Sequence, residues 1–556
     1  MALEYNDMIH QKPIFAAGRS RFIAIIVGYL CGLPFTAFAS TFNSDGSQAD
    51  VQSKINSAVD GDTVTIPSGL FTWTGGVTIS GKGIKLQGAG GARVVARSNT
   101  AMGIGTGTKV FTLTTETLTA LEALKSQITN GTTLKIWRTG GAVSGGSTTG
   151  AIPWMLGTVS SLNGTTLTMA ITDTNSSGTH PNWIIATIPA TTIVDSIVSG
   201  SASALITATE DASNSVEITG IGIEHAATLS TANANSANFI TVNGTSGGQP
   251  ILIHDCLFII YTYGDQIHCT SQRGIVWNCS FVSLPYSRAP LAIHNQANSF
   301  STSWTTASTM GTTDLTGKNN FYVEDCDFHA WANATDFDEN ARSVMRRCLF
   351  NNSGWGSHGA DSSSFGQRHF DVYDCVFFRN NYGDGQTLNV TQFFLLRGGT
   401  GIIADNVIPA FSGADYGSAP SIKLALWNLQ YNGGPNPLWG KDIAGIQYPC
   451  PRQIGFGRVT GSGTDGNGRT NDAITYVGDS EPLYIWGNTG TYTVVLSSFN
   501  NVQAGEDSIA DYIQAGRDYF NNGTAKPGYT QYPYPHPLRV GPTIPPSNAI
   551  ITIIVE

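Results

Sequence analysis

Charged residues are scarce in this chain. Asp, Glu, Lys and Arg make up 12% of its 556 residues, and the acidic ones outnumber the basic ones by 39 to 29, for a net charge of −10. Binding of nucleic acid needs a basic stripe or patch, so this composition argues against that class of partner. The shortage of charge accompanies 64 glycines. Such a composition is typical of a turn-rich all-β protein rather than a disordered chain.

Cysteine pairs with the spacing of a zinc site are also absent, since the sequence has no CxxC. Of the eight cysteines, Cys31 lies in an N-terminal leader, and an odd number remains. Five of these share one repeated frame, and Cys269 and Cys450 lie outside it. We expect the five to be buried thiols that pack as small hydrophobic groups, rather than disulfides or metal ligands.

Long apolar runs are missing after the first 39 residues, so no later segment is predicted to span a membrane. Within the leader, Arg19 and Arg21 precede the apolar run 22–30, and residues 37–39 read Ala-Phe-Ala. This order is typical of a signal peptide with an A-x-A cleavage site. We therefore interpret 1–39 as a signal peptide and expect a secreted, extracellular or cell-surface protein.

One frame recurs around five cysteines in the middle of the chain. An aliphatic residue or Met lies three positions before each cysteine, a Phe lies two positions after, and Asp or Asn directly precedes four of the five. The cysteines are Cys256, Cys279, Cys326, Cys348 and Cys375. Their spacings of 23, 47, 22 and 27 residues indicate a solenoid.

The parity of this frame predicts a bend. The aliphatic position and the cysteine cannot face the same side of one continuous strand, because side chains alternate strictly. Asp and Asn tolerate the left-handed backbone region best among non-glycine residues, so the residue before each cysteine is predicted to form a corner. Residues 218–223 fit the same frame with Gly at the corner, and residues 403–408 fit it with Asn in place of the cysteine. The expected fold is an all-β parallel β-helix with coils stacked about 4.8 Å apart.

The rest of the chain is divided around this solenoid. We expect the β-helix to occupy 40–540, with a capping helix near 47–59 in which Val51, Ile55 and Val59 share one face. A small inserted β subdomain is predicted at about 105–200, where the period breaks. Long surface loops are predicted at 410–480, and a C-terminal tail at 541–556.

Aligning the repeats on their cysteines predicts a second column upstream, at one outward position per coil. Its members are His268, His294, Asp338, His358 and Arg397. Neighbours would lie about 5 Å apart along one outer wall. A His beside a carboxylate is suited to general acid or base catalysis near neutral pH. The alternative is a purely structural polar ladder.

Other residues flank this column in the same alignment. Arg273, Arg342 and Arg368 would extend an exposed charged row and could bind a carboxylate or sulfate on a sugar chain. Trp277 and Tyr373 are predicted to be exposed and able to stack on sugars, or else to cover the surface. A further set, Asp336 and Glu339, could bind Ca²⁺ through carboxylate oxygens; no other cofactor is indicated.

The sequence DGDTVTIPSG after the capping segment, the V-x-N/D-C-x-F coils and the leader resemble the pectin-lyase-like superfamily of right-handed parallel β-helices. The resemblance implies a right-handed coil and a substrate laid along the sheet that carries the second column. Ser357-His358-Gly359 is similar to the G-H-G of polygalacturonase-like hydrolases, although their adjacent Asp pair and R-x-K are absent. Residues 339–346 are similar to the alginate and chondroitin lyase branch, without its lysine base. The segment GYTQYPYPHPL resembles the ends of uncharacterised secreted β-helix proteins.

Three hypotheses follow. The first is a polysaccharide lyase for an acidic, uronate-containing glycan: Arg342 and Arg368 bind the carboxylate, His358 oriented by Asp338 removes the proton, and Arg397 assists the departing oxygen. The second is a glycoside hydrolase of polygalacturonase type with Asp336 and Asp338 as acid and base. The third is a non-catalytic, adhesive glycan-binding β-helix. In each the partner is a polysaccharide or cell-surface glycan, and the oligomeric state is left open. The residues expected to bind the glycan are His268, His294, Arg273, Trp277 and Tyr373.

Overall fold

The computed structural model describes the chain in segments. These are residues 39–91, 95–114, 125–138, 152–197, 204–226, 238–260, 264–271, 273–287, 291–297, 314–331, 333–338, 340–357, 367–378, 392–408, 421–428, 442–443, 446–447, 453–455, 480–500 and 509–539. The predicted signal peptide, apart from its last residue, the tail 541–556 and most of the 410–480 loops lie outside these segments. Among the described residues, no helix combines the length and apolarity needed to cross a bilayer.

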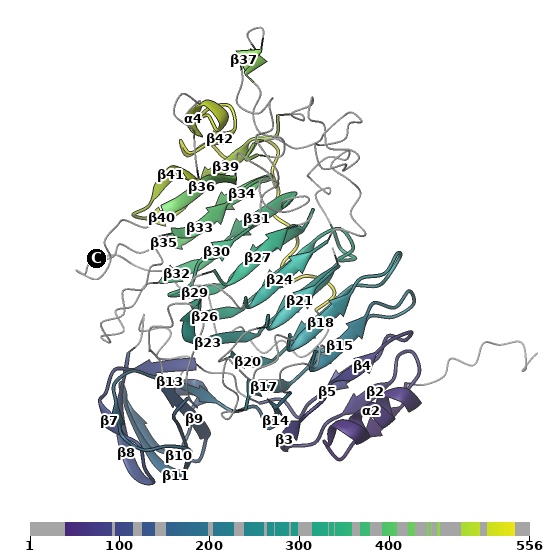
Figure 1. The fold of residues 1–556 in the computed structure, drawn as a ribbon, viewed down its shortest axis with the longest axis vertical. Helices are drawn as coiled ribbons and strands as arrows, with labels where there is room; N and C mark the ends of the chain where they lie inside the picture. The colour runs from purple at the N-terminus through teal and green to yellow at the C-terminus, as the bar shows by residue number, and fades with distance from the viewer. Residues whose placement is uncertain are drawn as a thin grey trace, which may run out of the picture. The chain divides into compact units, whose positions relative to one another are not determined.

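Parallel sheets form the three sides of a right-handed β-helix, as predicted (Figure 1). Sheet A has twelve strands: β1 (Thr41–Asn43), β2 (Thr63–Thr65), β5 (Lys85–Gln87), β16 (Glu217–Thr219), β19 (Ile251–His254), β22 (Gly274–Trp277), β25 (Phe321–Glu324), β28 (Arg342–Arg346), β31 (His369–Tyr373), β34 (Thr400–Ala404), β39 (Leu483–Trp486) and β42 (Tyr519–Phe520). Sheet B has ten: β3 (Gly69–Trp73), β14 (Thr191–Asp195), β17 (Ile221–His225), β20 (Leu257–Ile260), β23 (Ser280–Ser287), β26 (Asp327–Trp331), β29 (Leu349–Asn351), β32 (Val376–Phe378), β35 (Val407–Ile408) and β40 (Thr489–Gly490).

The third side of the coil consists of two consecutive sheets. Sheet C has β4 (Val77–Ile79), β15 (Ile206–Thr209), β18 (Ile240–Asn243), β21 (Ile267–Cys269), β24 (Ile293–Gln296) and β27 (Thr335–Asp338). Sheet D has β30 (Trp355–Gly356), β33 (Gln392–Leu396), β36 (Ser421–Asn428) and β41 (Thr493–Asn500). A single bridge between Phe337 and Ser357 connects them. Each coil thus passes from sheet C or D to A and then to B.

The corner between sheets A and B is the bend that the cysteine frame predicts. The residue before each cysteine has a positive φ between 51° and 56°, as does Asp405 one repeat later. Even Arg347, the exception in the sequence, adopts φ 55°. The corner conformation is therefore imposed by the coil geometry, and Asp or Asn is its preferred but not its obligatory occupant.

Side chains behind these corners form two ladders inside the coil. All five cysteines of the frame are free and buried, as predicted. The phenylalanines stack with ring centroids 4.6 to 5.1 Å apart along the axis. Beyond Cys375 the cysteine position is taken by Asn406 and Asn488, whose Nδ2 groups donate to the backbone carbonyls of Val372 and Ile403. Near the C-terminal end the ladder thus changes from thiols, which donate only weakly to backbone carbonyls, to amides, which are stronger donors.

A capping helix, α2 (Gln48–Ser57), covers the first coil. Ser47 is its N-cap and accepts a hydrogen bond from the backbone of Asp50. Val51 and Ile55 are buried in the core of the coil. The helix ends before Val59, which is 60% exposed, so the prediction that Val59 shares the buried face is wrong.

The inserted part is a closed six-stranded barrel. Its strands are β6 (Val95–Ser98), β8 (Gly107–Thr114), β9 (Thr133–Arg138), β10 (Trp154–Asn163), β11 (Thr166–Thr174) and β13 (Trp183–Thr187), and β7 (Met102–Gly103) pairs with β12 (Thr179–His180) beside them. Trp137 and Ile184 pack against Leu257 and Ile259 on the outside of sheet B. The barrel therefore covers part of sheet B.

The C-terminal part returns over sheet A. After α4 (Ile509–Tyr512) and β42, residues 526–539 run back along the outer face of sheet A. Tyr532 packs on Tyr322 and Tyr373, and the Tyr534 hydroxyl donates to Asp325. A separate short ribbon pairs β37 (Asp442–Ile443) with β38 (Ile446–Gln447).

Candidate functional site

The outward positions of β21, β24 and β27 bring polar side chains into one row. Ile267 pairs with Ile293, and Ile293 pairs with Thr335 on the next coil, so the following positions, His268, His294 and Asp336, are in register. The sequence alignment put Asp338 in this row. The structure pairs Asp338 with Gln296 instead. The error is a shift of two residues across the longest repeat, and such a shift keeps a side chain on the same face.

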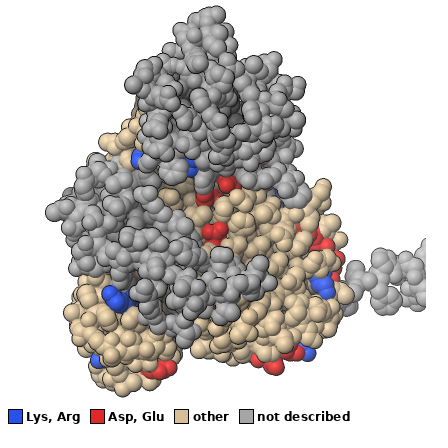
Figure 2. All heavy atoms as spheres, viewed as in Figure 1, with Lys and Arg blue, Asp and Glu red and all other residues tan. Residues whose placement is uncertain are grey.

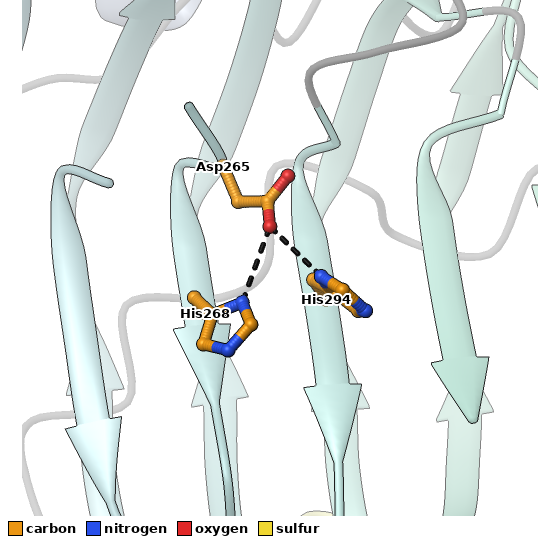
Figure 3. Close-up of side chains that lie close together, drawn as sticks. All are labelled: Asp265, His268 and His294. Atoms are coloured by element: carbon orange, nitrogen blue, oxygen red, sulfur yellow. Dashed lines mark hydrogen bonds and ion pairs between the residues drawn. The ribbon is translucent and has the colours of Figure 1, made fainter. Parts of the chain in front are cut away.

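Asp265, which the sequence analysis did not single out, joins the two histidines. Its Oδ2 lies 2.9 Å from Nδ1 of His294 and 3.3 Å from Nδ1 of His268. Figure 3 shows both contacts converging on a single carboxylate oxygen. The imidazole rings are 4.7 Å apart and perpendicular. The sequence signal for Asp265 was its position three residues before His268. Because the other coils do not repeat this D-x-x-H spacing, an alignment of the repeats does not reveal it.

The carboxylate of Asp265 is fixed by its surroundings. Its Oδ1 accepts a hydrogen bond from the backbone N–H of Leu291 (3.0 Å), and its own N–H donates to Oδ1 of Asn238 (2.9 Å). These contacts come from the coils on either side. Because Oδ1 is occupied in this way, Oδ2 is directed at the histidines.

Two more carboxylates border this group. Oδ2 of Asp338 lies 3.8 Å from Nε2 of His294 and accepts a hydrogen bond from Gln296 at 3.4 Å. Asp336 is half-buried on the same strand, and its charge also acts on His294. Figure 2 shows acidic side chains on the described surface in the area that β24 and β27 occupy in Figure 1. We call Asp265, His268, His294, Asp336 and Asp338 the sheet C cluster.

The electrostatics of the cluster favour a charged His294. Burial by itself would lower the pKa of His294, but the adjacent Asp265, Asp338 and Asp336 outweigh it and raise this pKa to about 10. Burial would likewise raise the pKa of Asp265, but hydrogen bonds from His268 and His294 lower it to about 2. At neutral pH the cluster therefore contains an imidazolium ion paired with a carboxylate, partly open to solvent.

The predicted arginines do not form an exposed row beside these residues. Arg273 donates to the carbonyls of Gly248 and Thr245 and lies 3.5 Å from the buried Glu210. Arg368 is 1% exposed and pairs with Glu481 at 3.0 Å. These contacts hold turns of the coil together, and the expectation of solvent-facing guanidinium groups is wrong.

Arg342 and Arg397 are buried as well, at 0% and 2% exposure. Burial, followed by the nearby charge of Arg368, lowers the pKa of Arg342 to about 10. Glu481 and Tyr532 also act on this guanidinium. Arg342 thus belongs to sheet A and its C-terminal cover rather than to the sheet C cluster.

The two aromatic residues expected to stack on sugars are also buried. Trp277 is 7% exposed and stacks on His254 with ring centroids 3.9 Å apart. Tyr373 is 1% exposed, and its hydroxyl accepts a hydrogen bond from Arg346. Both lie on the outer face of sheet A, where residues 526–539 cover it, so the prediction that they are exposed is wrong.

His358, the predicted base, lies outside the described residues. So does Glu339, which was predicted to bind Ca²⁺ together with Asp336. Among the residues that the structure does describe, the one group of three side chains with the geometry of a metal site is Asp265, His268 and His294. The chemical character of that group is mixed nitrogen and oxygen rather than the all-oxygen set that Ca²⁺ takes.

No protein-family model matches the sequence, and no curated protein matches it. Solved structures similar to the chain include an alginate lyase from Paenibacillus (11% identity, TM-score 0.32, covering 71% of this chain and 96% of that one). ORF18 of Geobacillus virus E2 is 12% identical with a TM-score of 0.28, over 76% and 62% of the two chains. The Gp54 tailspike of Acinetobacter baumannii phage AP22 is 10% identical with a TM-score of 0.21, over 68% and 66%. At these scores the likenesses carry no argument about activity.

Proposed function

We propose that the protein binds a polysaccharide along the outer face of sheet C and hydrolyses it there. The observation that carries the proposal is the sheet C cluster itself: three carboxylates and two imidazoles brought together from three successive coils, four of them at outward strand positions and Asp265 just before β21. Carboxylates and imidazoles bind sugar hydroxyls and transfer protons. An extended sheet repeats such contacts along the coil axis, which suits a polymer.

Asp336 and Asp338 are the pair proposed to act as acid and base. They lie two residues apart on one strand and face the same way, so their Cα atoms are about 6.6 Å apart. Inverting glycosidases hold their two carboxyl groups about 6.5–9.5 Å apart, which leaves room for an attacking water, and side chains on Cα atoms with this spacing can span such a separation. The His294 imidazolium, 3.8 Å from Asp338, provides a fixed positive charge beside this pair.

β-Elimination on a uronate is the second candidate. It is favoured by the charge of His294, which could pair with the substrate carboxylate. Of the two arginines that were expected to bind this carboxylate, Arg368 is paired with Glu481 and Arg342 is fully buried. For that reason we place hydrolysis first and elimination second.

The test is a product assay with purified protein on a panel of neutral and uronate-containing polysaccharides. Reducing ends without unsaturated sugar indicate hydrolysis, and reducing ends with unsaturated sugar indicate elimination. Asp338→Asn and Asp336→Asn should each lower the rate by about 10²–10⁴-fold, the usual effect of losing a general acid or base. The matched control is Asp173→Asn, an exposed barrel position, which should leave the rate unchanged. Full activity in both cluster variants would contradict the assigned site, and no product on any substrate would favour a non-catalytic binder.

A further inference from the structure

The group formed by Asp265, His268 and His294 has the donors and spacing of a transition-metal site. Three atoms from three positions converge, and all of them lie within 4.8 Å of one another. Tetrahedral ligands at about 2.0–2.1 Å from a zinc ion lie about 3.3 Å apart. Oδ2 of Asp265 lies 2.9 and 3.3 Å from the two imidazole Nδ1 atoms, which is close to this distance between two zinc ligands. A small rotation of the partly exposed His268 would complete the set.

The groups behind these three residues are arranged as around a metal. A metal-bound histidine commonly donates its second ring N–H to a carboxylate, which fixes its orientation. In this cluster Nε2 of His294 faces Oδ2 of Asp338 at 3.8 Å, and it has no hydrogen bond within the described residues. Gln296 holds that carboxylate from the other side. The ligand carboxylate is held too, through the Leu291 N–H on Oδ1 of Asp265.

The cluster is also accessible. Side chains of Asp265, His268 and His294 are 16%, 20% and 17% exposed, so an ion can enter and a fourth position can be filled from solvent. Three protein ligands with one open position is the composition of catalytic rather than structural zinc sites. Two imidazoles with one carboxylate suit zinc and its first-row neighbours, whereas Ca²⁺ and Mg²⁺ prefer oxygen ligands.

We propose that Asp265, His268 and His294 bind one divalent transition-metal ion, with zinc as the best match, on the outer face of sheet C. Metal binding at Nδ1 of His294 would displace the proton that pairs with Asp265, so the ion would supply the positive charge that the imidazolium gives Asp338 in the metal-free protein. Asp338, besides its proposed role as acid or base, is a positioning residue for the metal, since it orients His294 through Nε2. The inference concerns the site of the proposed function, but it requires no sugar. Zinc binding without glycan cleavage would leave this proposal standing and remove only the proposed activity.

The experiment is calorimetric titration of the chelator-treated full chain with ZnCl₂, and separately with CaCl₂. One zinc ion per chain should bind, and Ca²⁺ should bind far more weakly. Asp265→Asn and His294→Gln should each weaken zinc binding by at least about 100-fold, and Asp338→Asn by about 10-fold or more. Thr207→Ala, an outward position in the same register row two coils away, is the matched control and should bind as the unmodified chain does.

A second measurement separates ligand loss from unfolding. Zinc that binds only the folded chain must raise its unfolding temperature, and Co²⁺ at the same site should show visible absorption typical of nitrogen and oxygen ligands. Both effects should vanish in His294→Gln while its circular dichroism remains native. The proposal is overturned if the folded chain binds no stoichiometric zinc, or if folded Asp265→Asn and His294→Gln bind it as tightly as Thr207→Ala.

Discussion

Arg346 is the residue whose replacement should most clearly separate the coil from its C-terminal cover. Its side chain is fully buried. Nε and Nη2 bind Oε1 of Glu324 at 2.9 and 2.5 Å. Nη1 and Nη2 each donate at 2.6 Å to the covering segment, at the carbonyls of Tyr532 and Pro533. One guanidinium therefore links sheet A to residues 526–539.

In Arg346→Met, the carboxylate of Glu324 would remain buried with Arg539 at 2.8 Å and the backbone N–H of His536 at 3.3 Å as its remaining partners. Breaking a buried ion pair by removing one partner costs about 3–5 kcal/mol. The carbonyls of Tyr532 and Pro533 would also lose their donor, at about 1 kcal/mol each. Because Arg539 still compensates part of the charge, we expect a total loss of about 3–5 kcal/mol.

The loss should appear first in the cover and then in the whole chain. Hydrogen exchange in residues 526–539 should become much faster, and the midpoint of urea unfolding should fall. Arg347→Met is the matched control, because Arg347 lies next in the chain and stacks on the Tyr534 ring at 4.0 Å. Arg347 is only partly exposed, and a cation–π contact near the surface is worth about 0.5–1 kcal/mol.

A change in the free energy of unfolding of less than about 1 kcal/mol in Arg346→Met, or one no larger than that in Arg347→Met, would show that Arg346 does not hold the cover on sheet A. A double variant provides an internal check. Glu324→Gln with Arg346→Met should cost less than the sum of the two single changes, because the second change removes the unpaired charge that the first leaves behind.

Two further predictions concern the interior. Burial raises the pKa of Asp195 from 3.8 to about 6, so ionisation of this carboxyl opposes folding. The free energy of unfolding is therefore highest below pH 4, where Asp195 is protonated in both states, and it falls by about 3 kcal/mol as the pH rises through 6. Asp195→Asn keeps an acceptor for the Ile197 N–H and should therefore stabilise the protein at pH 8 but not at pH 4 in urea titrations; an equal effect at both pH values would contradict this. Phe328 stacks between two rings at 5.1 and 4.9 Å, so Phe328→Ala should lower the free energy of unfolding by about 3–5 kcal/mol, whereas Leu315→Ala, at a 51% exposed position, should change it by less than about 0.5 kcal/mol.

The repeated frame around Cys256 to Cys375 was sufficient to predict the coil, its corner and the buried thiols. The reason is that strand parity is a local property: an inward residue, a bend and an inward residue can be recognised wherever they occur. Arg347 shows how strong this constraint is, since it occupies a corner at φ 55° without the usual side chain. The outward direction of His268 and His294 followed from the same parity.

Contacts between coils and with the chain end were decided only by the tertiary structure. Asp265 meets His294 because turns from different coils stack, and no single repeat encodes that meeting. The register of Asp336 with His294 depends on how a long insertion closes. Trp277, Tyr373 and Arg342 are outward on their strands, as parity requires, yet residues 526–539 cover that face. Parity determines the side of a strand on which a residue lies, whereas exposure depends on which distant segment packs there, and that is determined by the burial of apolar surface over the whole fold.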